Sequence, residues 1–306
     1  MAAWLASVIG GVLVLAGCAQ KGAAPQVPSA LPPAVPPTPQ QLLGASVTGV
    51  FDATVTLTDG SYEGPPAAGG SSRPTLQLWA PSIAFGDVVD SSAGSEAVAL
   101  MSSSSGGSGE FVHVGVFAAS DGRARSLALA PVGDRVKLHR MWIEGTRIVM
   151  DVIEAGPGDP ACCPTQVVRK SYGWQEGTLA QLSSAAVGTL SVNLLAATDW
   201  VLVAMDGQPV PEGVMPPTVL VQYDKLVGFS GCSRYTGALS ESAPCVIRVG
   251  ALVDTRKACE GAAADVETKF LDHLTRAERY SLQAGQLLIT SPAAGAAAPL
   301  SLLFAR

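Results

Sequence analysis

The chain has 306 residues, enough for two domains of ordinary size. Only 14% of the residues are charged, well below the roughly 25% of a typical soluble domain, so the surface must be rich in small and hydroxyl-bearing residues. The net charge is −6 and no lysine–arginine cluster occurs, which argues against a nucleic-acid partner.

The chain begins with an uncharged apolar stretch, Ala2–Gly17, which is shorter than the roughly 20 residues that a membrane-spanning helix needs. It ends in Leu15-Ala16-Gly17-Cys18, and small residues before a cysteine resemble a bacterial lipobox. The resemblance implies a signal peptide at residues 1–17 and acylation of Cys18, for example by palmitate. The alternative is an apolar tail that carries no lipid.

The residue after the cysteine is Ala19 and not aspartate. By resemblance to Gram-negative sorting signals, this implies a lipid anchor in the outer membrane, facing the periplasm. Residues 18–42 then predict a tether, because seven prolines between positions 25 and 39 block helix and sheet and favour extended polyproline II. Such a tether spans about 3 Å per residue.

Residues 43–188 predict a β-rich domain without a long helix. Short alternating runs are separated by the turn signals Asp59-Gly60, Glu144-Gly145 and Gln175-Glu176-Gly177, which are typical of hairpins. Several short strands with frequent turns indicate an antiparallel sandwich or a barrel-like sheet.

One loop of this domain resembles the aspartate-rich calcium loops of envelope proteins. Calcium takes six or more oxygen ligands, and this loop offers only the carboxylates of Asp87, Asp90 and Glu96, with serines where further acids would stand. We therefore expect a solvated loop in preference to a metal site.

A second feature is the adjacent pair Cys162-Cys163, which lies between Pro160 and Pro164. A similar segment occurs in uncharacterised bacterial lipoproteins, and that resemblance implies no activity. In an exported protein the expected use is a structural disulfide. A strained, redox-active pair and a metal site remain as alternatives, the latter disfavoured because no histidine is near in sequence.

Residues 189–197 predict a linker, and residues 198–306 a second, smaller domain. Its strands are expected around Trp200, which we expect to be buried, at 219–223 and 246–249, and in three short runs after residue 279. Between them, Val266, Phe270 and Leu274 stand four residues apart and predict one apolar face of a helix at 262–277.

The most informative stretch runs from Gly228 to Cys259. Three glycines within ten residues, Gly228, Gly231 and Gly237, predict a tight, close-packed turn in place of a regular strand. Together with the residues that follow, this pattern resembles the META domain, or HslJ-like, family of bacterial envelope proteins. The residues that carry the resemblance are Gly228, Gly231, Cys232, Tyr235, Gly237, Thr255, Cys259 and Glu267.

The resemblance covers about the last third of the chain and departs from the family at Ser233, where asparagine is usual. It implies a small β-barrel-like sheet with one packed helix, an envelope location and an association with stress. It also implies a disulfide between Cys232 and Cys259, 27 residues apart. Cys245 lies outside the motif and could pair with Cys162 or Cys163, which leaves the full connectivity open.

The same stretch does not predict a catalytic site. Cys232 stands where a nucleophile elbow requires glycine, and no histidine is nearby to activate it or Ser230. No lysine follows to complete a phosphate-binding loop, and we expect Arg234 and Tyr235 to be packed turn residues, not a binding face.

The sequence therefore predicts a non-catalytic envelope lipoprotein with no cofactor, which binds a membrane through its anchor and a second envelope protein or a small ligand. A thiol-redox or metal-handling protein that uses Cys162 and Cys163 is the alternative.

Overall fold

The computed structural model describes residues 35–66, 69–89, 94–160, 163–292 and 298–306. These residues are mainly β, as predicted, with one helix longer than a single turn. The strands of the first half are β1 (Ser46–Val47), β2 (Val55–Thr56), β3 (Ser61–Glu63), β4 (Thr75–Leu78), β5 (Ala84–Gly86), β6 (Glu96–Ser104), β7 (Phe111–Ser120), β8 (Arg123–Asp134), β9 (Lys137–Glu144), β10 (Arg147–Glu154), β11 (Gln166–Gln175) and β12 (Thr178–Thr189).

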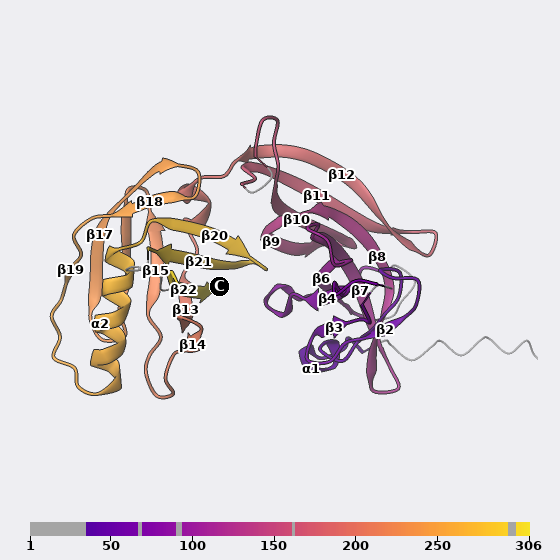
Figure 1. The fold of residues 1–306 in the computed structure, drawn as a ribbon, viewed down its shortest axis with the longest axis horizontal. Coiled ribbons are helices and arrows are strands. Elements are labelled where there is room, and N and C mark those ends of the chain that lie inside the picture. Colours follow the sequence, from indigo (N-terminus) through magenta and orange to yellow (C-terminus); the bar gives the residue numbers. More distant parts are fainter. Residues whose placement is uncertain (1–34, 67–68, 90–93, 161–162, 293–297) are drawn as a thin grey trace, which may run out of the picture. The chain divides into compact units, whose positions relative to one another are not determined.

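These strands form two sheets in the described residues. One has the order β2-β1-β8-β7-β6-β4-β3, with β5 beside β6, and the other has the order β12-β11-β10-β9 (Figure 1). All pairings are antiparallel except that of β1 with β8. The hairpins predicted at Asp59-Gly60, at Glu144-Gly145 and around Glu176 are present, and their Asp59 and Glu176 adopt positive φ.

Strand β6 is buried on both faces, which explains its continuous apolar sequence. Val98 and Leu100 face a core that is shared by both sheets. Ala97, Ala99 and Met101 of β6 face a second cluster on the opposite side. The two sheets thus enclose a common core, which agrees with the sandwich or barrel-like architecture that we predict from the sequence.

Two boundaries differ from the prediction. A short helix, α1 (Pro39–Leu42), occupies the end of the segment expected to be an extended tether. It forms because Thr38 and Gln41 build a capping box and because proline is tolerated in the first helical turn. The serine-rich run at residues 102–108 predicts a flexible loop, but strand β6 continues to Ser104, so part of this run is strand.

The second half contains the strands β13 (Trp200–Met205), β14 (Gln208–Pro209), β15 (Thr218–Gln222), β16 (Lys225–Phe229), β17 (Arg234–Ala243), β18 (Val246–Val249), β19 (Val253–Asp254), β20 (Arg279–Gln283), β21 (Gln286–Ser291) and β22 (Leu300–Ala305). They form one sheet in which hydrogen-bonded neighbours have the order β14-β13-β15-β16-β17-β18-β20-β21-β22, with β19 beside β17. Strand β13 also pairs with β22, which closes the path into the small barrel that the resemblance implies.

Helix α2 (Ala262–Thr275) packs against this sheet, as the spacing of its apolar residues predicts (Figure 1). Phe270 is fully buried, and its ring packs edge-on against the rings of Tyr235 and Phe304. The ring centroids are 5.7 Å and 6.4 Å apart, respectively. Trp200 is also fully buried, and its indole N–H donates to the carbonyl of Leu195 at 3.0 Å. Leu195 belongs to a short 3-10 helix, η2 (Val192–Leu195), so part of the predicted linker packs into this core.

The glycine-rich stretch is not one continuous turn, so that prediction is wrong in part. Gly228 lies in β16 and Gly237 lies in β17, and only residues 230–233 form the turn between them. The register of both strands is regular across each glycine.

In the part of the chain that the structure describes, no helix has the length and hydrophobicity to cross a membrane.

Candidate functional site

The turn at residues 230–233 joins β16 to β17 and holds the centre of the motif. The Ser230 amide donates to the Ser233 carbonyl at 2.8 Å. Between them, Gly231 has φ +101°, a conformation that residues with side chains rarely adopt. A Cβ at this position would also lie 3.2 Å from Val266 of α2, so the turn requires glycine at 231.

Gly228 makes room for a hydrogen bond that crosses its own strand. The Tyr235 hydroxyl on β17 donates to the Thr218 carbonyl on β15 at 2.8 Å, over the backbone of β16. A Cβ on Gly228 would stand 2.0 Å from that carbonyl oxygen and 2.9 Å from the hydroxyl. Burial raises the pKa of Tyr235, so the hydroxyl stays protonated and remains a donor.

Glu267 ties the turn to α2. Its Oε1 accepts from the Ser230 hydroxyl at 2.5 Å and from the Ser233 amide at 3.0 Å. Ser230 is fully buried and Ser233 is 2% exposed, so these donors have no access to water as an alternative partner. The carboxylate therefore satisfies two buried donors at once, and the Ser230 hydroxyl is engaged internally.

The segment that follows β19 is fastened to the same turn. Cys232 and Cys259 form the disulfide that the family resemblance implies, with their Cα atoms 6.2 Å apart. The Thr255 hydroxyl accepts from the Arg234 amide at 3.2 Å, and the Lys257 amide donates to the Ser233 hydroxyl at 3.2 Å. Seven of the eight motif residues thus come together in one braced unit, whereas Gly237 lies further along β17, opposite Leu226 of β16.

A groove of about 530 Å³ lies beside this unit. Its walls come from the loop before β15, from β15 and β16, from the start of β17 and from the segment after β19. The residues that line it are Met215, Pro216, Thr218, Phe229, Cys232, Arg234, Thr255 and Lys257. Arg234 is exposed, so our expectation that it packs into the turn is wrong, whereas Tyr235 is buried as expected.

A second, smaller pocket of about 190 Å³ is lined by both Cys163 and Cys245. Burial raises the pKa of the Cys245 thiol, and the nearby Glu241 and Cys163 add to this, against the opposing effect of Arg279. A raised pKa means little thiolate at neutral pH and hence low reactivity. Cys162 lies outside the described residues.

The loop before Cys163 is ordered by Asp159, a role that we do not predict from the sequence. One oxygen of its carboxylate accepts from the amides of Gly156 at 2.8 Å and Thr165 at 2.7 Å. These hydrogen bonds lower the pKa of Asp159. An aspartate between glycine and proline is a common signal for such a turn, and it could have been recognised.

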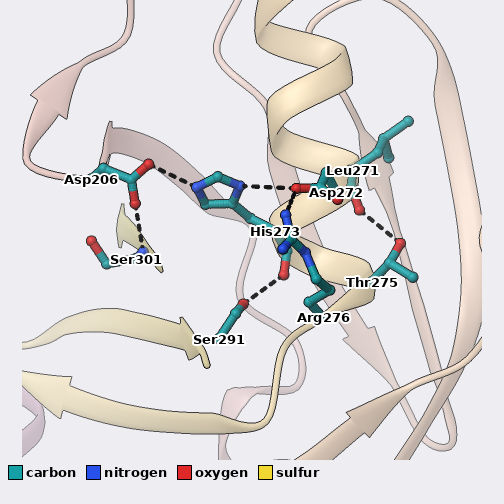
Figure 2. A network of polar contacts seen from close by, with 8 residues as sticks. All are labelled: Asp206, Leu271, Asp272, His273, Thr275, Arg276, Ser291 and Ser301. Atoms are coloured by element: carbon teal, nitrogen blue, oxygen red, sulfur yellow. Dashed lines mark hydrogen bonds and ion pairs between the residues drawn. The ribbon is translucent and has the colours of Figure 1, made fainter. Parts of the chain in front are cut away.

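A separate polar network fastens α2 to the strands around it (Figure 2). His273 Nε2 lies 2.8 Å from Oδ2 of Asp206, whose other oxygen accepts from the Ser301 amide at 2.8 Å. The Ser291 hydroxyl donates to the His273 carbonyl at 2.8 Å. Burial raises the pKa of Asp206, but the Ser301 and His273 contacts outweigh it and lower the pKa. The network joins the helix to β21, to β22 and to the turn between β13 and β14, and we assign it to packing.

The candidate calcium loop is described only in part. The Glu96 carboxylate is buried and accepts from the amides of Val88 at 2.9 Å and Val89 at 3.1 Å, which gives it a structural role. Asp87 is described, whereas Asp90 lies outside the described residues. The expectation of a solvated loop and the calcium alternative therefore both stay untested predictions. The same holds for the lipidation of Cys18 and most of the tether, because residues 1–34 also lie outside the described residues.

The C-terminal part of this β-rich protein is a small barrel with one packed helix and one disulfide. Residues 193–301 match the sequence model of the META domain family, so this part of the chain is a META domain. The match begins at 193, before the predicted boundary at 198, and it includes part of η2. The N-terminal β-rich part has no family assigned. No curated protein sequence matches the chain significantly.

Proposed function

We propose that the chain is a non-catalytic lipoprotein of the bacterial cell envelope whose META domain serves as a rigid binding module in stress tolerance or envelope maintenance. The observation that carries this proposal is the internal use of the motif's reactive groups. Ser230 is bound to Glu267, and Cys232 is consumed in a disulfide. A group already engaged in a buried hydrogen bond or a covalent crosslink is poorly placed to act as a nucleophile.

The histidines support the same conclusion. His273 is engaged with Asp206, His113 pairs with the Ser103 hydroxyl, and His139 pairs with the Leu194 carbonyl. Among the described residues, none of their hydrogen bonds reaches Ser230, so the arrangement of nucleophile and base that acyl transfer requires is not assembled there.

The envelope location rests on the sequence and on the disulfide. A structural disulfide is typical of proteins that fold in an oxidising compartment. Acylation of Cys18 would hold the protein at the outer membrane, since more than one acyl chain is needed for stable anchoring. The proline-rich segment after it would act as a spacer between the membrane and the first sheet.

The test is to express the full chain in a Gram-negative bacterium and follow incorporation of labelled palmitate and membrane fractionation. We expect the native chain to be labelled and to sediment with outer membranes, and Cys18→Ser to lose both properties. The matched control is Cys245→Ser, which removes a thiol elsewhere and should leave both unchanged. Labelling that persists in Cys18→Ser would contradict the proposed anchor.

A second candidate function is thiol-redox or metal handling, because Cys163 and Cys245 line one pocket. The raised pKa of Cys245 speaks against a reactive thiol. Purified protein should therefore contain no stoichiometric metal, and its disulfides should have the low reduction potential of structural crosslinks. Bound zinc, or a disulfide in equilibrium with glutathione, would favour this second function over the first.

A further inference from the structure

We propose that the groove beside the braced turn of the META domain binds a phospholipid with a phosphate monoester head group. The inference rests on the proposed function, in which the domain is a binding module, and it names the class of ligand.

The register of three neighbouring strands builds one side of the groove. Thr218 on β15 is directly opposite Phe229 on β16, which is directly opposite Arg234 on β17. Residues directly opposite one another in antiparallel strands point to the same face of the sheet. The next row, which contains Tyr235, points to the other face, where α2 packs. The row of Thr218, Phe229 and Arg234 is therefore on the face away from the helix.

The groove is positively charged and has no compensating acid. Arg234 and Lys257 are both exposed, and no carboxylate is among the lining residues. Among the described residues, neither cation makes an ion pair within 4 Å. The Glu267 carboxylate is already engaged with Ser230 and Ser233, and Oδ1 of Asp254 accepts from the Arg256 amide at 2.7 Å. Two cations without partners favour an anion with more than one negative charge.

Two hydroxyls add donors to the same groove. Thr218 Oγ1 accepts from the Phe229 amide at 3.1 Å, and Thr255 Oγ1 accepts from the Arg234 amide at 3.2 Å. Each hydroxyl oxygen therefore serves as an acceptor, and its own hydrogen remains available to a ligand oxygen. A guanidinium, an ammonium and two hydroxyls suit a phosphate monoester better than a carboxylate, because the monoester carries up to two negative charges on three acceptor oxygens and a carboxylate carries one charge on two.

The remaining lining residues are apolar and suit the acyl part of the ligand. Met215 is 67% exposed, and Pro216 and Phe229 are half-buried beside it. An exposed methionine that lines the same groove as an aromatic ring is typical of surfaces that adapt to apolar ligands. The site is also preorganised, because the backbone around Arg234 and Lys257 is fixed by Thr255, Ser233 and the disulfide.

The experiment is isothermal titration calorimetry of the full-length protein, purified in a non-ionic detergent at constant concentration. The probes are dihexanoyl phosphatidic acid, which carries head and acyl chains, dihexanoyl phosphatidylcholine, whose phosphate is a diester shielded by choline, and inorganic phosphate, which is the head alone. We expect binding of phosphatidic acid and at least about tenfold weaker binding of the other two.

Arg234→Gln and Lys257→Gln should each weaken phosphatidic acid binding about tenfold, the loss expected for one charge-assisted hydrogen bond. The matched control is Arg248→Gln on β18, which removes the same charge from an exposed position outside the groove and should leave binding unchanged. Thermal melts of all variants check that the fold is intact.

Three results would overturn the inference: no binding by the native protein, equal binding in the Gln variants, or equal binding of inorganic phosphate, which would leave an oxyanion site without a lipid. None of these would affect the proposed non-catalytic role, which instead fails if purified protein shows turnover that depends on Ser230 or Cys232.

Discussion

At the scale of single residues, the META motif is explained by what each side chain, or its absence, does for its neighbours. Glu267 accepts from two buried donors, Gly231 adopts a positive φ, and Gly228 leaves space for the hydrogen bond between Tyr235 and Thr218. Each of these roles fails on substitution for a different physical reason, and stability measurements can separate them.

Replacing Glu267 by alanine should lower the free energy of unfolding by about 2 kcal/mol, because the Ser230 hydroxyl and the Ser233 amide would lose their charged acceptor where water does not reach and would keep only the hydrogen bonds between the two serines. Glu267→Gln keeps an acceptor oxygen and should cost less. Urea denaturation measures both. Thr268→Ala, an exposed neighbour on the same helix, should change stability by less than about 0.5 kcal/mol. If Glu267→Ala were as mild as this control, the turn would not depend on the carboxylate.

Gly228→Ala should destabilise the protein by about 2 kcal/mol or more, because its Cβ would overlap the Thr218 carbonyl and force β15 and β16 apart. Gly188→Ala is the matched control, since this glycine of β12 has open space around its Cβ position and no positive φ. It should be neutral or slightly stabilising. Thermal denaturation of the two variants makes the comparison, and equal melting temperatures would contradict the steric role of Gly228.

At the scale of elements, the disulfide joins the turn before β17 to the segment before α2. Closing a loop of 27 residues restricts the unfolded chain and is worth about 3–4 kcal/mol in the chain-entropy description. Because α2 packs through Phe270 against the barrel, the crosslink also limits how far the helix can move when the barrel opens.

The double variant Cys232→Ser with Cys259→Ser should therefore lose about 3–4 kcal/mol of unfolding free energy, while the domain keeps its β-rich circular dichroism at low temperature. Reduction of the native protein with dithiothreitol should give the same loss. Cys245→Ser, outside the disulfide, should shift the midpoint of urea unfolding much less. If the double variant had the same unfolding free energy as the native protein, the crosslink would not stabilise the domain.

The elements differ in how well the sequence predicts them. Helix α2 was predictable because Val266, Phe270 and Leu274 repeat at its period, and the hairpins because each turn carries glycine after an acidic residue. Strand β16 was not, because glycine at 228 is disfavoured in an isolated strand and is explained only by the neighbouring strands.

The groove could not be predicted either. Thr218, Phe229 and Arg234 are separated in sequence, and only the pairing of β15 with β16 and of β16 with β17 puts them in one row. Strand register depends on the whole sheet and not on the local pattern. The motif residues thus indicated where the site is, and the residues that give it a chemistry came from the register.

At the scale of the whole molecule, the chain carries a half-buried and a buried histidine, His113 and His139, that link its stability to pH. Burial lowers the pKa of His113 and of His139, and the charge of Arg306 lowers that of His139 further. The Leu194 carbonyl can only accept, so His139 Nε2 carries the proton that it donates at 3.0 Å. Nδ1 is then a buried nitrogen that has no partner among the described residues, and a proton added there would find no acceptor.

The pKa of these histidines is lower in the folded protein than in the unfolded chain. Below about pH 6.5 the unfolded chain therefore binds a proton that the folded protein does not, and acidification destabilises the folded protein. We therefore expect the free energy of unfolding to fall between about pH 7 and pH 5. In this window the carboxyls with lowered pKa, such as Asp151 and Asp206, do not yet titrate, since their contribution is lost only below about pH 4. Urea unfolding at a series of pH values measures the slope.

The variant that isolates the effect is His139→Gln, whose amide can still donate to Leu194 but does not titrate. It should flatten the slope between pH 7 and pH 5, and adding His113→Gln should flatten it further. The control is Gly188→Ala, which should follow the native curve. If His139→Gln kept the native slope, the acid sensitivity would have to come from other groups, and His139 would be no more than a neutral hydrogen-bond donor between β9 and η2.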